Sequence, residues 1–305
     1  SWESGSSLWT TGRAADPRVL AKEGHPYVSS SASVLERHEY PATPPRELSK
    51  TEIHHYIQNY AQAAKNAVIE AGFDGVEIHA ANGYLIDQFN QDICNKRTDE
   101  YGGSIENRSR FALEVLEAVV GAVGAKRTGI RFSPWTRFQG MRMKNPIPTF
   151  AYLVSEIAQR HPDLAYVHFI EPVASGSSGA EDESRDRDPV NDTLTSNDFA
   201  RIIWQPRPFF SAGGFNPESA FLEAETKDVC IIIGRYFISN VSVTGCSRAP
   251  GTTVSNPYSL ICPSDFAMGY PFLLMIEEPF IQLVQKQSRD ISTICQQIRS
   301  ARSLD

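Results

Sequence analysis

The feature that most constrains the fold is a regular alternation of helical and strand patterns between residues 49 and 233. Each strand pattern is a short, almost continuous apolar run, which is typical of strands that are buried on both faces. Each helical pattern places apolar residues three or four positions apart. This alternation predicts an α/β protein in which helices cover a parallel sheet.

The sequence indicates where these elements begin and end. The first helix is predicted to begin after Ser49, because Ser49 and Glu52 have the spacing of a capping box, and to end before Gly72. The later helices are expected at Glu106 to Val123, Pro148 to Gln159, Asn197 to Trp204 and Pro217 to Lys227. The strands are expected at Gly75 to His79, Gly129 to Ser133, Ala165 to Ile170, Pro208 to Ala212 and Val229 to Ile233, with the end of a sixth at Ser7 to Trp9.

Composition excludes several classes of partner. The chain of 305 residues has a net charge of −7 and no cluster of basic residues, so we expect no nucleic acid partner. No apolar run reaches the roughly 18 residues that a membrane span needs, which predicts a soluble, cytoplasmic protein. The five cysteines are widely spaced and lack the pairing typical of zinc sites, so no metal site is expected.

The alternation stops near residue 240, which suggests two regions. Residues 1–240 are expected to form one α/β domain, and residues 241–305 a C-terminal tail. Within the tail, residues 272–298 have the pattern of one amphipathic helix that Pro279 interrupts.

Polar residues follow the strand that ends at His79. Ligands of parallel α/β sheets bind beyond the carboxyl ends of the strands, so these positions are candidates for a site. His79 and Asn82 can both donate hydrogen bonds to one carbonyl oxygen, and the phenol of Tyr84 can supply a proton. A lone histidine after a strand is more often structural, but three suitable groups within six residues favour a catalytic and substrate-binding site.

Two further features point to an anionic ligand. Arg131 is a permanent cation in an apolar strand, and it requires either an anionic ligand or a nearby carboxylate. Gly213 and Gly214 follow one of the last two strands, and Gly234 and Arg235 follow the other. Glycines at such positions let backbone N–H groups approach a phosphate, and barrels commonly bind phosphate at their final two strand ends.

Several motifs resemble those of the Old Yellow Enzyme family. The resemblance rests on GVEIHAANGYL from Gly75, DQF from Asp87, RTDEYGGSIENR from Arg97, Leu8-Trp9, GRAA from Gly12 and GRYFISN from Gly234. The region around Gly12 is most similar to fungal enzymes of secondary metabolism, including reductases of chanoclavine aldehyde. The family fold is a (β/α)8 TIM barrel that contains FMN and reduces activated alkenes with NADPH or NADH.

The resemblance implies roles for the candidate residues. His79 and Asn82 would bind the carbonyl oxygen of an α,β-unsaturated aldehyde or ketone, and Tyr84 would protonate its α-carbon. Arg131 would lie beside the flavin ring, where its charge stabilises the reduced form. The phosphate of FMN would be bound by the glycines and the arginine at the last two strand ends, Gly213, Gly214, Gly234 and Arg235.

The chain also departs from the family pattern. The first two family strands have no counterpart, Ser7 stands where the family usually has Gln, and the sequence after Asn240 is unrelated. We therefore expect residues 1–240 to form a partial FMN-binding TIM barrel and residues 241–305 a tail that diverges from the family. The open sheet edges of the incomplete barrel are expected to be covered by other segments or by a second copy in a homo-oligomer. The alternative to an active reductase or flavin-dependent isomerase is an inactive truncated pseudoenzyme with weak or no flavin binding. A non-redox barrel enzyme that binds phosphate is a third reading.

Overall fold

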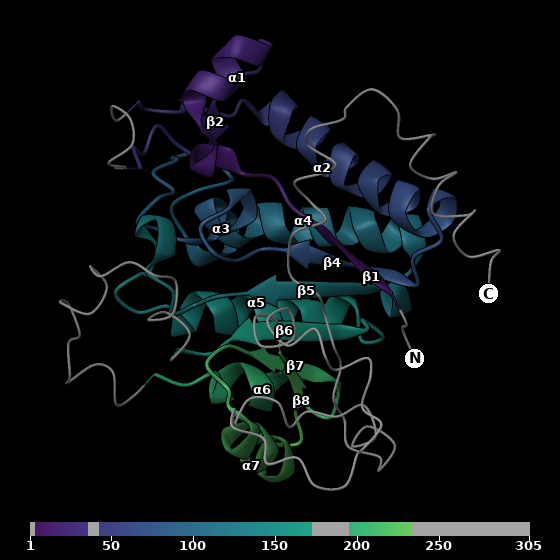
Figure 1. Cartoon of the computed structure of the whole chain (residues 1–305). Coiled ribbons are helices and arrows are strands. Elements are labelled where there is room, and N and C mark those ends of the chain that lie inside the picture. Colours follow the sequence, from purple (N-terminus) through teal and green to yellow (C-terminus); the bar gives the residue numbers. More distant parts are fainter. Residues whose placement is uncertain (1–3, 36–42, 173–194, 234–305) are drawn as a thin grey trace, which may run out of the picture.

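The computed structural model describes residues 4–35, 43–172 and 195–233. Within them, one six-stranded sheet has the order β1-β4-β5-β6-β7-β8, and every neighbouring pair is parallel (Figure 1). The strands are β1 (Gly5–Leu8), β4 (Gly75–His79), β5 (Thr128–Phe132), β6 (Tyr166–Ile170), β7 (Phe209–Ala212) and β8 (Cys230–Ile232). The predicted parallel sheet is confirmed, including the strand expected near Ser7.

Helices connect the consecutive strands of this sheet. They are α2 (Lys50–Lys65), α4 (Ile105–Val123), α5 (Ile147–Arg160), α6 (Asp198–Trp204) and α7 (Pro217–Lys227). The capping box predicted at Ser49 is present, since Ser49 Oγ accepts from the Glu52 N–H while the Glu52 carboxylate accepts from the Ser49 N–H. A π-helical turn, Asn66–Glu70, continues α2 toward β4.

Four short elements were not expected from the sequence. They are α1 (Pro17–Glu23), the parallel pair β2 (Val28–Ser29) and β3 (Arg46–Glu47), and α3 (Leu85–Asn90). Helix α3 matters most for the site, because it follows directly on the candidate residues after β4. All six of its residues are buried.

The two faces of the sheet have different compositions. Successive side chains of a strand point to opposite faces, and the register places His79, Arg131 and His168 side by side on β4, β5 and β6. We call the face that carries these residues, together with Glu77 and Tyr166, the site face. The opposite face is the helix face, because it packs against the helices.

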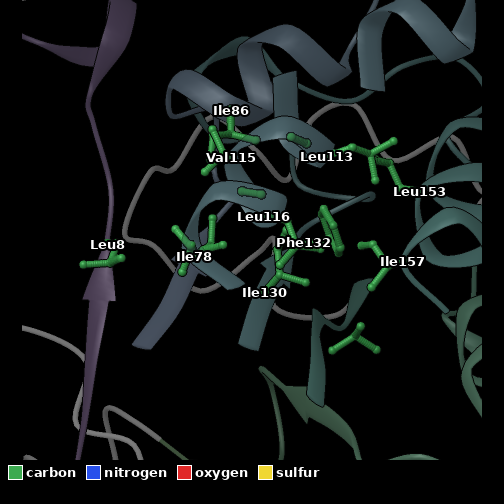
Figure 2. Packing of buried hydrophobic residues seen from close by; sticks show 14 of the residues in the cluster. Leu8, Ile78, Ile86, Leu113, Val115, Leu116, Ile130, Phe132, Leu153 and Ile157 are labelled. Atoms are coloured by element: carbon green, nitrogen blue, oxygen red, sulfur yellow. The ribbon is translucent and has the colours of Figure 1, made fainter. Parts of the chain in front are cut away.

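The helix face forms the main hydrophobic core. Ile78, Ile130 and Phe132 of the sheet are fully buried against residues of α4 and α5. Figure 2 shows these side chains together with Leu113, Leu116, Leu153 and Ile157. A smaller apolar cluster lies on the site face near β7 and β8, formed by Tyr166, Phe210, Ala212 and Ile232.

Some expectations concern residues outside the described ranges. Gly234, Arg235 and the whole segment 241–305 lie there, so the proposed division at residue 240 stays a prediction. Among the described residues, no helix has both the length and the apolar character that crossing a membrane would require.

Candidate active site

The imidazole of His79 lies at the carboxyl end of β4, on the site face. It is 8% exposed, and its Nε2 atom has no hydrogen-bond partner within the described part of the chain. Burial, followed by the nearby charge of Arg131, lowers the pKa of His79 to about 3. His79 is therefore a neutral imidazole at physiological pH.

Asn82 and Tyr84 follow His79 in a tight turn. Asn82 (φ +56°) and Gly83 (φ +74°) are both in the left-handed region, and Tyr84 is the N-cap residue of α3. The ring of Tyr84 lies between two others, with centroids 5.3 Å from the His79 ring and 4.6 Å from the Trp9 ring. The predicted trio is thus brought to one place, with Asn82 and Tyr84 both partly exposed.

Arg131 lies next to His79 in register and is buried on the site face. The sequence left open whether an anionic ligand or a carboxylate accompanies this cation. The structure places a carboxylate, that of Glu77, near this cation. Burial lowers the pKa of Arg131, and the negative charge of Glu77 partly opposes this shift.

Glu77 and His168 form a buried pair that the sequence did not reveal. His168 Nδ1 lies 2.8 Å from Glu77 Oε2, and the two side chains are 1% and 3% exposed. Burial and the charge of Arg131 lower the pKa of His168, although Glu77 opposes this shift. These residues are 91 positions apart, and only the register of β4, β5 and β6 shows that they meet.

Gly213 and Gly214 follow β7, as predicted. Their φ angles are +105° and +75°, a conformation that side chains disfavour and that turns the chain sharply at the carboxyl end of the strand. Gly214 is exposed and Gly213 is partly exposed. The other two residues expected at the phosphate, Gly234 and Arg235, lie outside the described ranges.

This arrangement can be compared with known proteins. The family model described as "NADH:flavin oxidoreductase / NADH oxidase family" matches residues 5–245. The chain belongs to this family. Old Yellow Enzyme from Pichia sp. AKU4542 has a similar structure, with a TM-score of 0.66 and 36% sequence identity over 77% of this chain and 60% of that chain. The expected membership of the Old Yellow Enzyme family and the TIM-barrel fold class are both confirmed.

Two curated fungal relatives differ in what their names say. Chanoclavine-I aldehyde reductase fgaOx3 of Penicillium roqueforti (strain FM164) is 52% identical over 238 residues. Probable inactive reductase easA of Epichloe festucae var. lolii is 44% identical over 243 residues. Each of these two matches covers 76% of this chain. The chain spans 60% of the length of each curated protein.

Family membership bears on the cofactors. The expectation of FMN, reduced by NADPH or NADH, is confirmed for the family to which the chain belongs. Within the described residues, the groups suited to a flavin are a buried permanent cation, Arg131, a buried imidazole with an unbonded Nε2, His79, and the left-handed glycines after β7. Their chemistry fits an anionic ring system with a phosphate tail.

Proposed function

We propose that this chain carries the site of an FMN-dependent reductase that acts on the C=C bond of an α,β-unsaturated aldehyde or ketone. The observation that carries the proposal is the buried, neutral His79, whose Nε2 has no hydrogen-bond partner within the described ranges. An unsatisfied buried polar atom is costly in a folded protein, and a bound ligand would remove that cost. The aldehyde reductase named among the relatives supports an aldehyde as the substrate class.

The carbonyl oxygen of the substrate would be bound by His79 and Asn82. A neutral imidazole donates one hydrogen bond, and the Asn82 carboxamide forms no hydrogen bond with another described residue, so its N–H groups are available. Two donors on one carbonyl oxygen withdraw charge from the conjugated alkene and stabilise the enolate that forms. Because His79 stays neutral, this polarisation does not depend on an imidazolium.

Bound FMN would supply the hydride that reaches the β-carbon of the substrate. Arg131 would hold the flavin ring through its permanent charge, and Gly213 and Gly214, with Gly234 and Arg235, would bind the phosphate. Tyr84 would donate its phenolic proton to the α-carbon. The ring of Tyr84 is suited to this role because its contacts with Trp9 and His79 fix its position beside the carbonyl donors.

A specific observation favours a second function. Ser7 pairs with Glu77 in register and so lies on the site face, where the short hydroxyl side chain stands at the position of the amide expected from the family. Several fungal relatives are named as probably inactive. The alternative is therefore a pseudoenzyme that binds FMN weakly or not at all.

A visible spectrum of the purified protein separates these two functions. A reductase should show a flavin absorption band in stoichiometric amount, which NADPH or NADH bleaches and an α,β-unsaturated aldehyde restores. A protein that stays colourless after incubation with FMN would contradict the reductase and support the pseudoenzyme.

The proton donor can be tested by Tyr84→Phe. Loss of the phenol should slow alkene reduction about a hundredfold, the lower range for general acid catalysis, while reduction of the flavin by NADPH stays unchanged. The matched control is Tyr152→Phe, which removes the same hydroxyl from a partly exposed residue of α5. Equal rates of alkene reduction in Tyr84→Phe and the control would remove Tyr84 from this role.

A further inference from the structure

The turn at Asn82 and Gly83 has an unusual set of hydrogen bonds. Both residues have left-handed backbone conformations, so their N–H and C=O groups cannot join a regular helix or sheet. All four of these groups are nevertheless hydrogen-bonded, and every partner is a side chain. Ser133 Oγ accepts from the Asn82 N–H at 2.7 Å, Gln139 Nε2 donates to the Asn82 carbonyl at 2.9 Å, Asp87 Oδ2 accepts from the Gly83 N–H at 2.9 Å, and Gln88 Nε2 donates to the Gly83 carbonyl at 2.7 Å.

We call Asp87, Gln88, Ser133 and Gln139 the supporting residues. They come from two directions, because Asp87 and Gln88 belong to α3 whereas Ser133 and Gln139 follow β5. Asp87, Gln88 and Ser133 are all 0% exposed. The two hydrogen bonds that α3 makes to Gly83 are buried, and the two that the segment after β5 makes to Asn82 are partly buried, so the turn is held from both sides.

The segment after β5 packs tightly on the turn. A Cβ atom built at Gly83 would lie 2.8 Å from Gln139 Cβ and 2.9 Å from Met141 Cγ. This segment is in turn attached to the loop after β1, since the Arg13 guanidinium donates to the Gln139 carbonyl at 2.9 Å. Gln139 therefore has little freedom to move away from Asn82.

We propose that the four supporting residues are positioning residues, which preset the Asn82–Gly83 turn so that the Asn82 carboxamide and the Tyr84 phenol stand ready beside His79. This inference rests on the proposed function, because it assigns the supporting residues to that same carbonyl site. The backbone of the turn is bonded only through these side chains, while the Asn82 carboxamide is left unbonded within the described residues. A substrate would then meet donors that are already in place, and little ordering would be needed on binding.

Two variants test the proposal without removing a group that would touch the substrate. Ser133→Ala deletes the acceptor for the Asn82 N–H, and Gln139→Glu replaces the donor to the Asn82 carbonyl by an acceptor of the same shape. Ser31→Ala is the control for the first, because Ser31 Oγ is a buried acceptor for the distant Lys96 N–H at 2.8 Å. Gln62→Glu is the control for the second, because the Nε2 of Gln62, an exposed residue of α2, donates to Asn66 Oδ1 in the π-helical turn.

The first measurement is amide hydrogen exchange in the purified full chain, which needs neither flavin nor substrate. Each test variant should speed exchange at the Asn82 and Gly83 amides on the order of tenfold, the effect expected for the loss of one hydrogen bond. The two control variants should leave these amides as they are in the wild type. Unchanged exchange in both test variants would overturn the proposal.

The second measurement separates positioning from a general structural role. For alkene reduction, kcat/KM should fall on the order of tenfold in each test variant, whereas flavin reduction by NADPH should keep its wild-type rate. Faster exchange with unchanged kcat/KM would overturn the positioning role. If the wild type reduces no alkene, the proposed function fails, and exchange alone then decides whether the supporting residues hold the turn.

Discussion

His79 is an imidazole that the fold keeps uncharged. Its position at the end of a buried strand, beside the permanent charge of Arg131, makes a second positive charge unfavourable there. The same environment leaves Nε2 without a partner within the described part of the chain. One residue therefore links the stability of the protein to the chemistry proposed for the site.

The pKa of His79 predicts how stability depends on pH. Because the pKa of the folded state, about 3, is below the ordinary value of 6.5, the unfolded state binds the proton more readily. Stability from this residue is complete above about pH 6.5 and is lost as the pH falls toward 3. Between pH 6.5 and 5, the wild type should lose about 2 kcal/mol more than His79→Gln in the free energy of unfolding.

Urea unfolding at a series of pH values measures this difference. The control is His55→Gln, which changes an exposed imidazole on α2 and should retain the wild-type dependence. Parallel curves for the wild type and His79→Gln would show that His79 is not buried as a neutral group.

At the residue scale, the sequence predicted groups that are close along the chain and missed those that are not. His79, Asn82 and Tyr84 could be recognised because six consecutive residues contain them all. Glu77 and His168 could not, because their contact depends on the alignment of three strands. Ser133 and Gln139 also escaped notice, since polar residues after a strand are common in loops and their partners here are backbone atoms.

At the scale of elements, close contacts across the site face decide which substitutions a strand tolerates. Gly129 of β5 pairs with Tyr166 of β6, and a Cβ atom at Gly129 would lie 2.3 Å from the Tyr166 ring. That ring cannot move aside easily, because it is stacked on Phe210 with a centroid distance of 4.1 Å. The glycine is thus required by the neighbouring strand.

Gly129→Ala should therefore destabilise the protein, by about 2 kcal/mol, the usual cost of overpacking a core. Gly121→Ala provides the opposite case, because Gly121 is exposed within α4 and a Cβ atom there would meet nothing within 4 Å. That substitution should stabilise the protein by about 0.5 to 1 kcal/mol, since alanine favours helix. Chemical denaturation of both variants checks the predicted signs, and destabilisation of equal size in both would contradict the explanation.

The helices that the sequence predicted are those whose apolar residues recur at a regular helical spacing. Helices α2, α4 and α5 have one apolar stripe each, and the bounds of α4 and α5 lie within one residue of those expected. Helix α2 begins as expected after Ser49 but ends at Lys65, and the π-helical turn extends it to Glu70. Helix α3 has no polar face, because all its residues are buried, and α1 has no buried residue at all. Neither helix has the alternation of apolar and polar residues from which helices are recognised.

At the scale of the whole molecule, Glu77 compensates the charge of Arg131 in the middle of the sheet. Burial by itself would raise the pKa of Glu77, but His168 and Arg131 lower it below the ordinary value. The resulting cluster joins β4, β5 and β6 across the site face. Its charges are shielded from solvent, so they depend on one another.

Glu77→Gln should consequently destabilise the whole fold by about 3 to 5 kcal/mol, because it leaves a buried cation without its carboxylate. The control is Glu117→Gln, since Glu117 also pairs with a histidine, His161, at 3.1 Å but is 68% exposed. That substitution should cost less than about 1 kcal/mol. Guanidinium unfolding compares the two, and a loss in Glu77→Gln no larger than in the control would refute the compensating role.

The family of the protein could be predicted from the sequence, whereas the contacts along the outer strands of the sheet could not. The motif around His79 and the alternation of elements both depend on local sequence; the motif led to the correct family, and the alternation led to the parallel sheet covered by helices. Within the described residues β1 and β8 are the outer strands of the sheet. The expectation that other segments or a second copy cover their edges stays a prediction, because no local sequence pattern encodes such contacts.

Residues of β4 alternate strictly between the helix face and the site face, which limits the mutations that this strand can tolerate. Val76 and Ile78 contact the helices, whereas Glu77 and His79 lie on the opposite face. Inserting or deleting a single residue inside this strand would exchange the two sets, placing a carboxylate in the hydrophobic core and a valine or isoleucine side chain on the site face. Length variants of this protein should therefore have their insertions in loops, while β4 changes only by substitution.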